Sequence, residues 1–401
     1  MPNLISVENT GKISKLEYLV MFLAIALSGN PILIYSGSKL IYVVAAAAIF
    51  ILCLMKGKKL SNTTFIFWLV CSCILFFFQN TILKITSVMA EFNFLARLYI
   101  AFLTAMFFGY KFRKVYLRVM VAICLISIPL FLLDLAGINF GYTIDRYSSV
   151  LFYNFMNIGR NPGMFWEPGA FQGFIMLVPL LYSDSLKQLW ITQKKQCVIL
   201  LIALLTTQST TGYLAFAAFI FLTILLNGKM NIVIRGGLIA IFFVALTYIW
   251  SQDFMGEKIA DEIKSAQTIG SGDVSWTRMG AMVIDIKNIS RHPIIGNGFL
   301  MNSRYGILGD YMAGTGNGFS GTINMLGIPF MLLFFIGIFK NLTFIPTPNR
   351  LIFIFIIIML LNGEYMLNYP FFWSLLFIKI PQNTYKNERQ LIPQRIQSIK
   401  K

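Results

Sequence analysis

The sequence is poor in charged residues, and above all in acidic ones. Of its 401 residues only 12% are charged, and 33 basic side chains stand against 16 acidic ones. Apolar residues make up 57% of the chain, and the mean hydropathy is +0.72. These values lie outside the range of soluble globular proteins. The scarcity of charge therefore excludes an ordinary soluble domain and indicates an integral membrane protein.

Residues and motifs that hold metals or nucleotides are also scarce. His292 is the single histidine, and no Asp-x-Asp pair, HExxH, Walker A or GxSxG sequence occurs. These absences argue against a metalloprotease, a P-loop NTPase, a hydrolase of the GxSxG type and a metal-dependent sugar-nucleotide enzyme. All five cysteines lie in apolar segments, which favours packing over disulfides or a zinc site. The sequence predicts no metal and no cofactor.

Apolar runs are what the chain has in abundance. Twelve of them predict an all-α integral membrane protein with about twelve transmembrane helices. They cover approximately 16–35, 39–55, 63–78, 94–110, 115–136, 169–184, 197–209, 212–227, 233–250, 318–339, 350–362 and 369–380. Several are shorter than the roughly 20 residues that cross a bilayer directly, so we expect some spans to be broken or to include polar neighbours.

Basic residues collect in alternate connections between these runs. The connections hold Lys56, Lys58 and Lys59; Lys111, Arg113, Lys114 and Arg118; Lys187, Lys194 and Lys195; Lys229 and Arg235; Lys340 and Arg350; and, in the C-terminal tail, Lys386, Arg389, Arg395, Lys400 and Lys401. This bias predicts that these connections and both termini are cytoplasmic. It also explains much of the net charge of +17 through topology and anionic lipid, without a nucleic-acid partner.

The opposite face is expected to carry two long connections, 138–168 and 251–317. Loops of this length are uncommon in a compact domain unless they are functional. We predict a single polytopic membrane domain over residues 1–401, with 138–168 as a periplasmic loop and 251–317 as a larger periplasmic loop subdomain. No internal repeat is visible in the sequence.

A polar decapeptide, Arg160–Gly169, marks the end of the first long loop. A charged side chain at the edge of an apolar span is costly, so it predicts a functional site. Asn161-Pro162-Gly163 is a turn signal, and Pro168 suits the first turn of a helix, which places Glu167 at a helix N-terminus. Glu167 then either complements the helix dipole or pairs with Arg160. Alternatively it acts as a general base or sugar-hydroxyl acceptor, with Arg160 binding negative charge.

Further arginines on the external side are not explained by topology. They are Arg97, Arg146, Arg160, Arg278, Arg291 and Arg304. The planar, permanently charged guanidinium suits phosphate recognition. Arg97 has two interpretations, an interfacial anchor or a phosphate ligand.

Three more titratable groups lie near the external interface. For His292, the role of a capping or hydrogen-bonding residue is favoured over the role of a catalyst. Glu364 and Asp134 are acids that either terminate a helix or bind substrate.

Four segments in order resemble the O-antigen polymerase and O-antigen ligase superfamily. They are Gly159–Gly169, Leu204–Gly212, Thr277-Arg278 and Arg291-His292-Pro293-Ile294-Ile295-Gly296-Asn297-Gly298. The resemblance extends from about Gly159 to Gly337. It combines these short motifs with the predicted spans and the large loop before the tenth span.

The resemblance implies a C-type glycosyltransferase that needs no metal. Such an enzyme would lie in the bacterial inner membrane and act on the periplasmic face on an undecaprenyl-pyrophosphate-linked oligosaccharide donor and acceptor, with a polysaccharide chain-length regulator as a further possible partner. The implied catalytic residues are Arg160 and Arg278, which bind the departing pyrophosphate, and Glu167, which accepts the proton of the acceptor. Arg97, Arg291, His292 and Arg304 are the implied substrate-binding residues.

Two departures favour a polymerase over a ligase. Ligases share a Ser-Arg pair at this point of the pattern, whereas Thr210 follows Ser209 in this sequence. They also carry a histidine before the asparagine near the tenth span, whereas Gly316 precedes Asn317. A ligase remains one alternative, and a lipid-linked oligosaccharide flippase is another. The flippase is disfavoured by the large loop and by the lack of a two-fold repeat.

Overall fold

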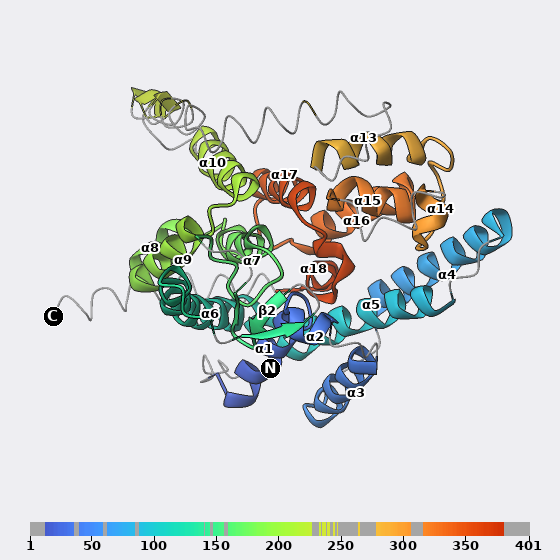
Figure 1. Cartoon of the computed structure of the whole chain (residues 1–401), viewed down its shortest axis with the longest axis horizontal. Helices are drawn as coiled ribbons and strands as arrows, with labels where there is room; N and C mark the ends of the chain where they lie inside the picture. Colours follow the sequence, from blue (N-terminus) through green and yellow to red (C-terminus); the bar gives the residue numbers. More distant parts are fainter. Residues whose placement is uncertain are drawn as a thin grey trace, which may run out of the picture.

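The protein is helical, with one small sheet (Figure 1). The computed structural model describes residues 13–35, 40–58, 62–84, 88–139, 141–144, 147–155, 159–226, 278–305 and 316–380, with isolated residues between 232 and 264. The prediction of a helical protein is confirmed for this part of the chain, although the small sheet was not predicted. Most of the expected span 233–250, Arg146, much of the 251–317 loop and the basic tail lie outside the described residues.

The described residues up to Asn154 form six helices and the sheet. The helices are α1 (Lys15–Ala26), α2 (Pro31–Tyr35), α3 (Leu40–Met55), α4 (Thr63–Leu83), α5 (Val88–Phe108) and α6 (Phe112–Leu135), with a 3-10 turn, η1 (Gly109–Lys111), between the last two. A three-stranded antiparallel sheet follows, β1 (Tyr142–Ile144), β2 (Tyr147–Val150) and β3 (Tyr153–Asn154). The sheet occupies the predicted 138–168 loop.

The other helices of the described residues follow the sheet in the chain. They are α7 (Pro168–Leu181), α8 (Leu186–Thr192), α9 (Lys194–Thr206), α10 (Thr210–Leu225), α13 (Arg278–Ile289), α14 (Met301–Tyr305), α15 (Gly318–Leu326), α16 (Ile328–Asn341), α17 (Thr347–Gly363) and α18 (Pro370–Trp373), with 3-10 turns η3 (Met366–Asn368) and η4 (Ser374–Leu376). In Figure 1, α7, α17 and α18 lie between the α6, α8 and α9 group and the orange α13 to α16 group.

Several of these helices could cross a membrane. α4 is long and apolar enough, and so is the continuous run 88–135, which has 48 residues. The 3-10 turn η1, where Gly109 has φ +50°, lies in the middle of this run, so the run is not one uninterrupted α-helix. Two bent pairs, α8 with α9 and α15 with α16, each pass the same test together, which gives up to 4 candidate spans among the described residues. The count of twelve stays a prediction.

The last apolar run differs from its expected form. Residues 369–380 were expected to form a span, but they form only the four-residue α18 and the three-residue η4. Phe371, Phe372 and Trp373 are each about 1% exposed, and Trp373 packs against Phe94 and Phe334. A helix this short cannot cross a bilayer, so the run forms part of the protein core.

Three of the basic connections meet at one end of the molecule. Glu17 in the first turn of α1 accepts hydrogen bonds from Lys56 and from Lys111, both at 3.2 Å. Arg113 in turn lies 3.5 Å from Asp184, in the connection before α8. These ion pairs bring the connections together, and their cytoplasmic location stays a prediction.

Candidate functional site

The predicted decapeptide is a buried loop that is bonded to the end of α9. The Asn161 side chain donates to the Thr206 hydroxyl at 2.9 Å, and its backbone N–H donates to the Thr206 carbonyl at 2.9 Å. Its Oδ1 accepts from the Gly163 N–H at 2.9 Å, which forms the predicted turn. Met164 and Phe165 are fully buried. The loop therefore has a fixed course into α7.

Glu167 lies at the start of α7, as predicted. It is the N-cap residue and Pro168 follows at the first helical position, where a missing N–H costs nothing. Its side chain makes no capping hydrogen bond, and 40% of that side chain is exposed. Its carboxylate lies 3.7 Å from the Arg278 guanidinium. The ion-pair partner of Glu167 is thus Arg278, where Arg160 was one of the predicted partners.

Arg278 connects three helices at the first residue of α13. Its Nη2 lies 2.9 Å from Glu364 Oε1 and 3.7 Å from Glu167 Oε2, and its Nη1 donates to the Thr211 hydroxyl at 3.1 Å. Glu364 follows α17, Glu167 precedes α7 and Thr211 is in the first turn of α10. One guanidinium therefore joins three chain segments that are distant in sequence.

Glu364 is the residue of this cluster whose role the sequence left open. It terminates α17 as the C-cap and is 6% exposed. Its Oε2 accepts a hydrogen bond from the Trp166 indole N–H at 3.1 Å. A Cβ atom on Gly169 would overlap the Glu364 carboxylate, so any larger residue in this turn of α7 would displace that side chain. The "Trp-Glu-Pro-Gly" stretch thus contributes both a donor to Glu364 and the space that it occupies.

The electrostatics favour a cationic site at neutral pH. Burial, and after it the neighbouring Glu167 carboxylate, raises the pKa of Glu364 to about 8, although Arg278 and the Trp166 hydrogen bond act in the opposite direction. A protonated Glu364 adds no negative charge beside Arg278 and Arg160. The site is therefore suited to an anionic ligand.

Arg160 completes the cluster. Burial lowers the pKa of its guanidinium, Glu167 opposes this shift, and the charge of Arg278 adds to it. Arginine stays protonated despite such shifts. The buried Nε of Arg160 has no hydrogen-bond partner within the described part of the chain. The Nε atoms of Arg97, Arg304 and Arg350 have no partner there either, so this donor does not by itself distinguish Arg160.

No protein-family model matches the chain, and no curated protein is significantly similar to it.

The four predicted substrate-binding residues have other neighbours. Arg97 on α5 lies over the ring of Tyr42 on α3, 5.4 Å from its centroid, which fits the anchor interpretation better than the phosphate one. Arg304 lies over Tyr305 on α14, also at 5.4 Å. Arg291 is exposed. The carbonyl of His292 accepts from the Gly296 N–H at 2.8 Å, so this residue takes part in a turn.

The segment after His292 is bonded to the break between α15 and α16. Asn297 N–H donates to the Asn324 carbonyl at 2.7 Å, and Ile328 N–H donates to the Pro293 carbonyl at 2.8 Å. Gly296 has φ +71°, and a Cβ there would lie 2.5 Å from a backbone carbonyl oxygen. Glycine is thus required by backbone conformation and by close approach. This motif supports the fold at the helix break.

A second buried carboxylate, Asp285 on α13, was not singled out in the sequence. It accepts hydrogen bonds from the Tyr305 and Ser320 hydroxyls, both at 2.6 Å, and from the Asn324 amide at 2.9 Å. Burial raises the pKa of Asp285, and these hydrogen bonds oppose the shift. The sequence holds no local signal for it, because its partners come from α14 and α15.

Proposed function

We propose that the protein is a glycosyltransferase of the bacterial inner membrane that polymerises undecaprenyl-pyrophosphate-linked oligosaccharide repeat units at the periplasmic face. The observation that supports this best is the position of Arg278 between Glu167 and Glu364, with Arg160 close enough to interact with all three. The resemblance of the Gly159–Gly169 and Thr277-Arg278 segments to the O-antigen polymerases supplies the substrate class.

The proposed transfer needs positive charge beside the departing pyrophosphate and a base beside the acceptor hydroxyl. The acceptor hydroxyl attacks the anomeric carbon, the bond from that carbon to the pyrophosphate oxygen breaks, and negative charge develops on the pyrophosphate. Arg160 and Arg278 bind that charge, and guanidinium groups stabilise it through bidentate hydrogen bonds. No group of three His, Cys, Asp or Glu side chains that could hold a metal occurs among the described residues.

The two glutamates take different roles. Glu167 has 40% of its side chain exposed, so it can reach the acceptor hydroxyl and accept its proton. Glu364 is buried and contacts Arg278 directly at 2.9 Å. It is a positioning residue that fixes the guanidinium for the leaving group.

A cell-based assay of polysaccharide chain length tests the proposal. In a strain that depends on this protein, Arg278→Ala and Arg160→Ala should each lower polymer formation by about 100-fold and cause single repeat units to accumulate on the acceptor lipid. Lys287→Ala, an exposed cation on α13, is the matched control. Immunoblots of the membrane fraction establish that each variant is present.

Two outcomes would contradict the proposal. If the Arg278→Ala protein is present in the membrane in normal amounts and long polysaccharide chains are still made, the assignment of Arg278 to the catalytic site is wrong. A complete loss of surface sugar, without accumulated single repeat units, would indicate a flippase instead. Polymer made by purified protein and lipid-linked repeat units in the presence of a chelator would support the metal-free mechanism.

A further inference from the structure

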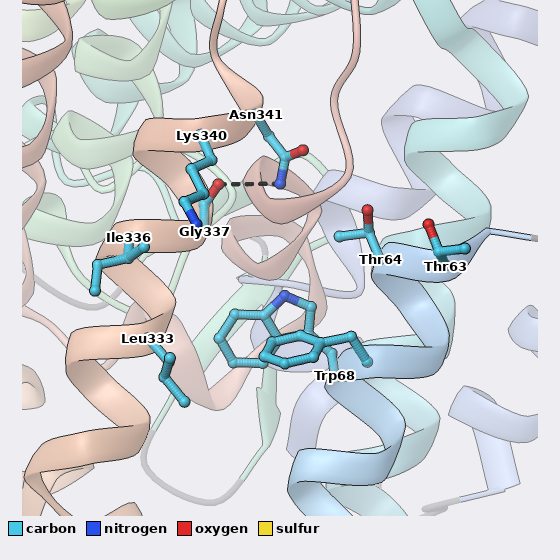
Figure 2. A pocket seen from close by; sticks show the side chains of 9 residues that line it. Thr63, Thr64, Trp68, Leu333, Ile336, Gly337, Lys340 and Asn341 are labelled. Carbon is cyan, nitrogen blue, oxygen red and sulfur yellow. Dashed lines mark hydrogen bonds between the residues drawn. The ribbon is translucent and has the colours of Figure 1, made fainter.

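A groove between α4 and α16 lies away from the Arg278 cluster. It has a volume of about 370 Å³ and is lined by Thr63, Thr64, Phe67, Trp68, Leu333, Ile336, Gly337, Lys340 and Asn341. Figure 2 shows Thr63, Thr64 and Trp68 on one wall, facing Leu333, Ile336 and Lys340 on the other. α4 is one of the helices that could cross a membrane.

One end of the groove is polar and basic. Thr63 and Thr64 form the first turn of α4, and Lys340 lies in the last turn of α16. Lys379 donates to the Thr64 hydroxyl at 3.4 Å, which adds a second ammonium group beside the groove. Lys340 and Lys379 are both exposed. This end therefore offers two cations and two hydroxyls to an anion.

The other end is apolar and open to the surroundings of the molecule. Phe67 and Ile336 are 49% and 48% exposed, and Leu333 lies beside them. Gly337 lets α16 pack closely against the floor of the groove, because a Cβ there would lie 2.8 Å from Leu376 and 3.0 Å from Trp68. The groove thus changes from charged to apolar along the helix axes.

The groove is remote from the proposed catalytic site. Arg350, near the start of α17, donates to the carbonyl of Phe339, which precedes Lys340. Glu364 terminates the same helix. α17 has 17 residues, so at about 1.5 Å per residue its ends are roughly 25 Å apart. The basic end of the groove and the Arg278 cluster therefore lie near opposite ends of α17.

We propose that this groove binds one anionic phospholipid of the surrounding bilayer. Its phosphate lies between Lys340, Lys379 and the Thr64 hydroxyl, and one acyl chain follows Phe67, Leu333 and Ile336. Charge complementarity favours an anionic headgroup, because ammonium groups next to a span attract anionic lipid. The apolar wall favours a lipid over a free phosphate ion, which would leave that surface uncovered.

Lipid retention by the purified full chain tests this assignment. Native mass spectrometry in detergent, with equal amounts of phosphatidylglycerol and phosphatidylcholine of the same acyl chains, should show preferential retention of one phosphatidylglycerol. The double variant Lys340→Glu/Lys379→Glu should weaken its binding by about tenfold or more, since each basic residue near the headgroups contributes about 1 kcal/mol. Ile336→Trp, which fills the exposed apolar wall, should weaken binding of either lipid.

The matched control is Lys194→Glu/Lys195→Glu, the same change of charge at two exposed residues at the start of α9. The proposal would be overturned if the protein bound the two phospholipids with equal affinity. It would also be overturned if the control variant lost as much affinity for phosphatidylglycerol as Lys340→Glu/Lys379→Glu. Displacement of phosphatidylglycerol by an equal amount of undecaprenyl phosphate would assign the groove to the carrier lipid instead. If the double glutamate variant does not fold, Lys340→Gln/Lys379→Gln gives the same comparison. The assay contains no repeat units, so its result is independent of the polymerase proposal.

Discussion

Two buried carboxylates, Asp285 and Glu364, show how differently this protein uses the same chemical group. Asp285 is fully buried and accepts hydrogen bonds from three neutral donors on α14 and α15. Glu364 is almost as buried, but its partners are the charged Arg278 and the Trp166 indole, and the partly exposed Glu167 lies next to it.

The difference distinguishes an acid that is bonded within the fold from one that lies in the proposed site. The oxygens of Asp285 are satisfied within the fold, as is usual for a buried polar group. The Glu364 cluster contains two arginines, the buried Nε of Arg160 has no partner within the described part of the chain, and Glu167 is accessible. We therefore expect changes at Asp285 to affect stability and changes at the Glu364 cluster to affect activity.

The largest expected effect is on stability at Asp285. Asp285→Ala removes the acceptor of three buried donors and should lower the free energy of unfolding by about 4 kcal/mol, at 1–3 kcal/mol for each unsatisfied group. Thermal unfolding of the purified protein in detergent measures this. Asp285→Asn should lower the free energy of unfolding by less, because the Ser320 hydroxyl can rotate and accept a hydrogen bond from the new amide. Equal losses in both variants would show that the hydrogen bonds do not explain the stability.

The next effect is a dependence of stability on pH that comes from Glu364. Its pKa in the folded protein, about 8, lies above the ordinary value of 4.5. The folded state thus keeps a proton that the unfolded chain has lost, so this stabilisation is complete below about pH 4.5 and is lost as the pH rises towards 8. The free energy of unfolding should fall by a few kcal/mol between about pH 5 and 8. Glu364→Gln should show a flatter profile across that range.

A smaller effect is expected from closing the space in front of Glu364. In Gly169→Ala the added methyl overlaps the carboxylate, and strain of this kind costs about 1–3 kcal/mol. The displaced glutamate no longer positions Arg278, so polymer formation should fall by about tenfold or more. Gly236→Ala, where an added Cβ meets no other atom, is the control. Normal polysaccharide chain length with the Gly169→Ala protein would show that the position of Glu364 does not affect polymer formation.

The smallest effect is expected for Glu364→Gln measured at neutral pH. The amide keeps the shape of the side chain and an oxygen that can accept from Arg278 or from Trp166. Because Glu364 is protonated at neutral pH, its replacement by a neutral amide should reduce polymer formation by less than about tenfold. The same change in Glu167 should cost more, because a general base contributes about 10²–10⁴-fold. A larger loss of polymer formation in Glu364→Gln than in Glu167→Gln would indicate that Glu364 is the general base and Glu167 the positioning residue.

The local features of the site were predictable. The turn at Asn161-Pro162-Gly163, the helix start at Pro168 and the N-cap position of Glu167 all follow from short-range preferences of proline, glycine and asparagine. Most apolar runs within the described residues form helices, as expected. The run 369–380 was the exception, because composition alone cannot distinguish a span from a buried core segment.

The pairings within the site were not predictable. Arg278 and Glu364 are 86 residues apart, and Trp166 and Glu364 are 198 apart. The Arg291–Gly298 motif likewise suggested substrate binding through His292 and Arg291, but its glycines and backbone groups form the contact with the α15–α16 break. A glycine that is required for close packing and one that is required for ligand binding have the same sequence signature.

The sequence by itself determined the helical class, the uneven distribution of basic residues and the position of Glu167 at a helix start. These depend on composition, hydrophobic periodicity and helix-end chemistry, all of which act over a few residues. The choice of Arg160, Glu167 and Arg278 as candidates also used the resemblance of short motifs. Only the tertiary structure decided that Glu364 joins Arg278, that Asp285 is structural, and that a groove with a basic end lies between α4 and α16. Each of these depends on which helices pack together, and that choice is made by the burial of surfaces that lie far apart along the chain.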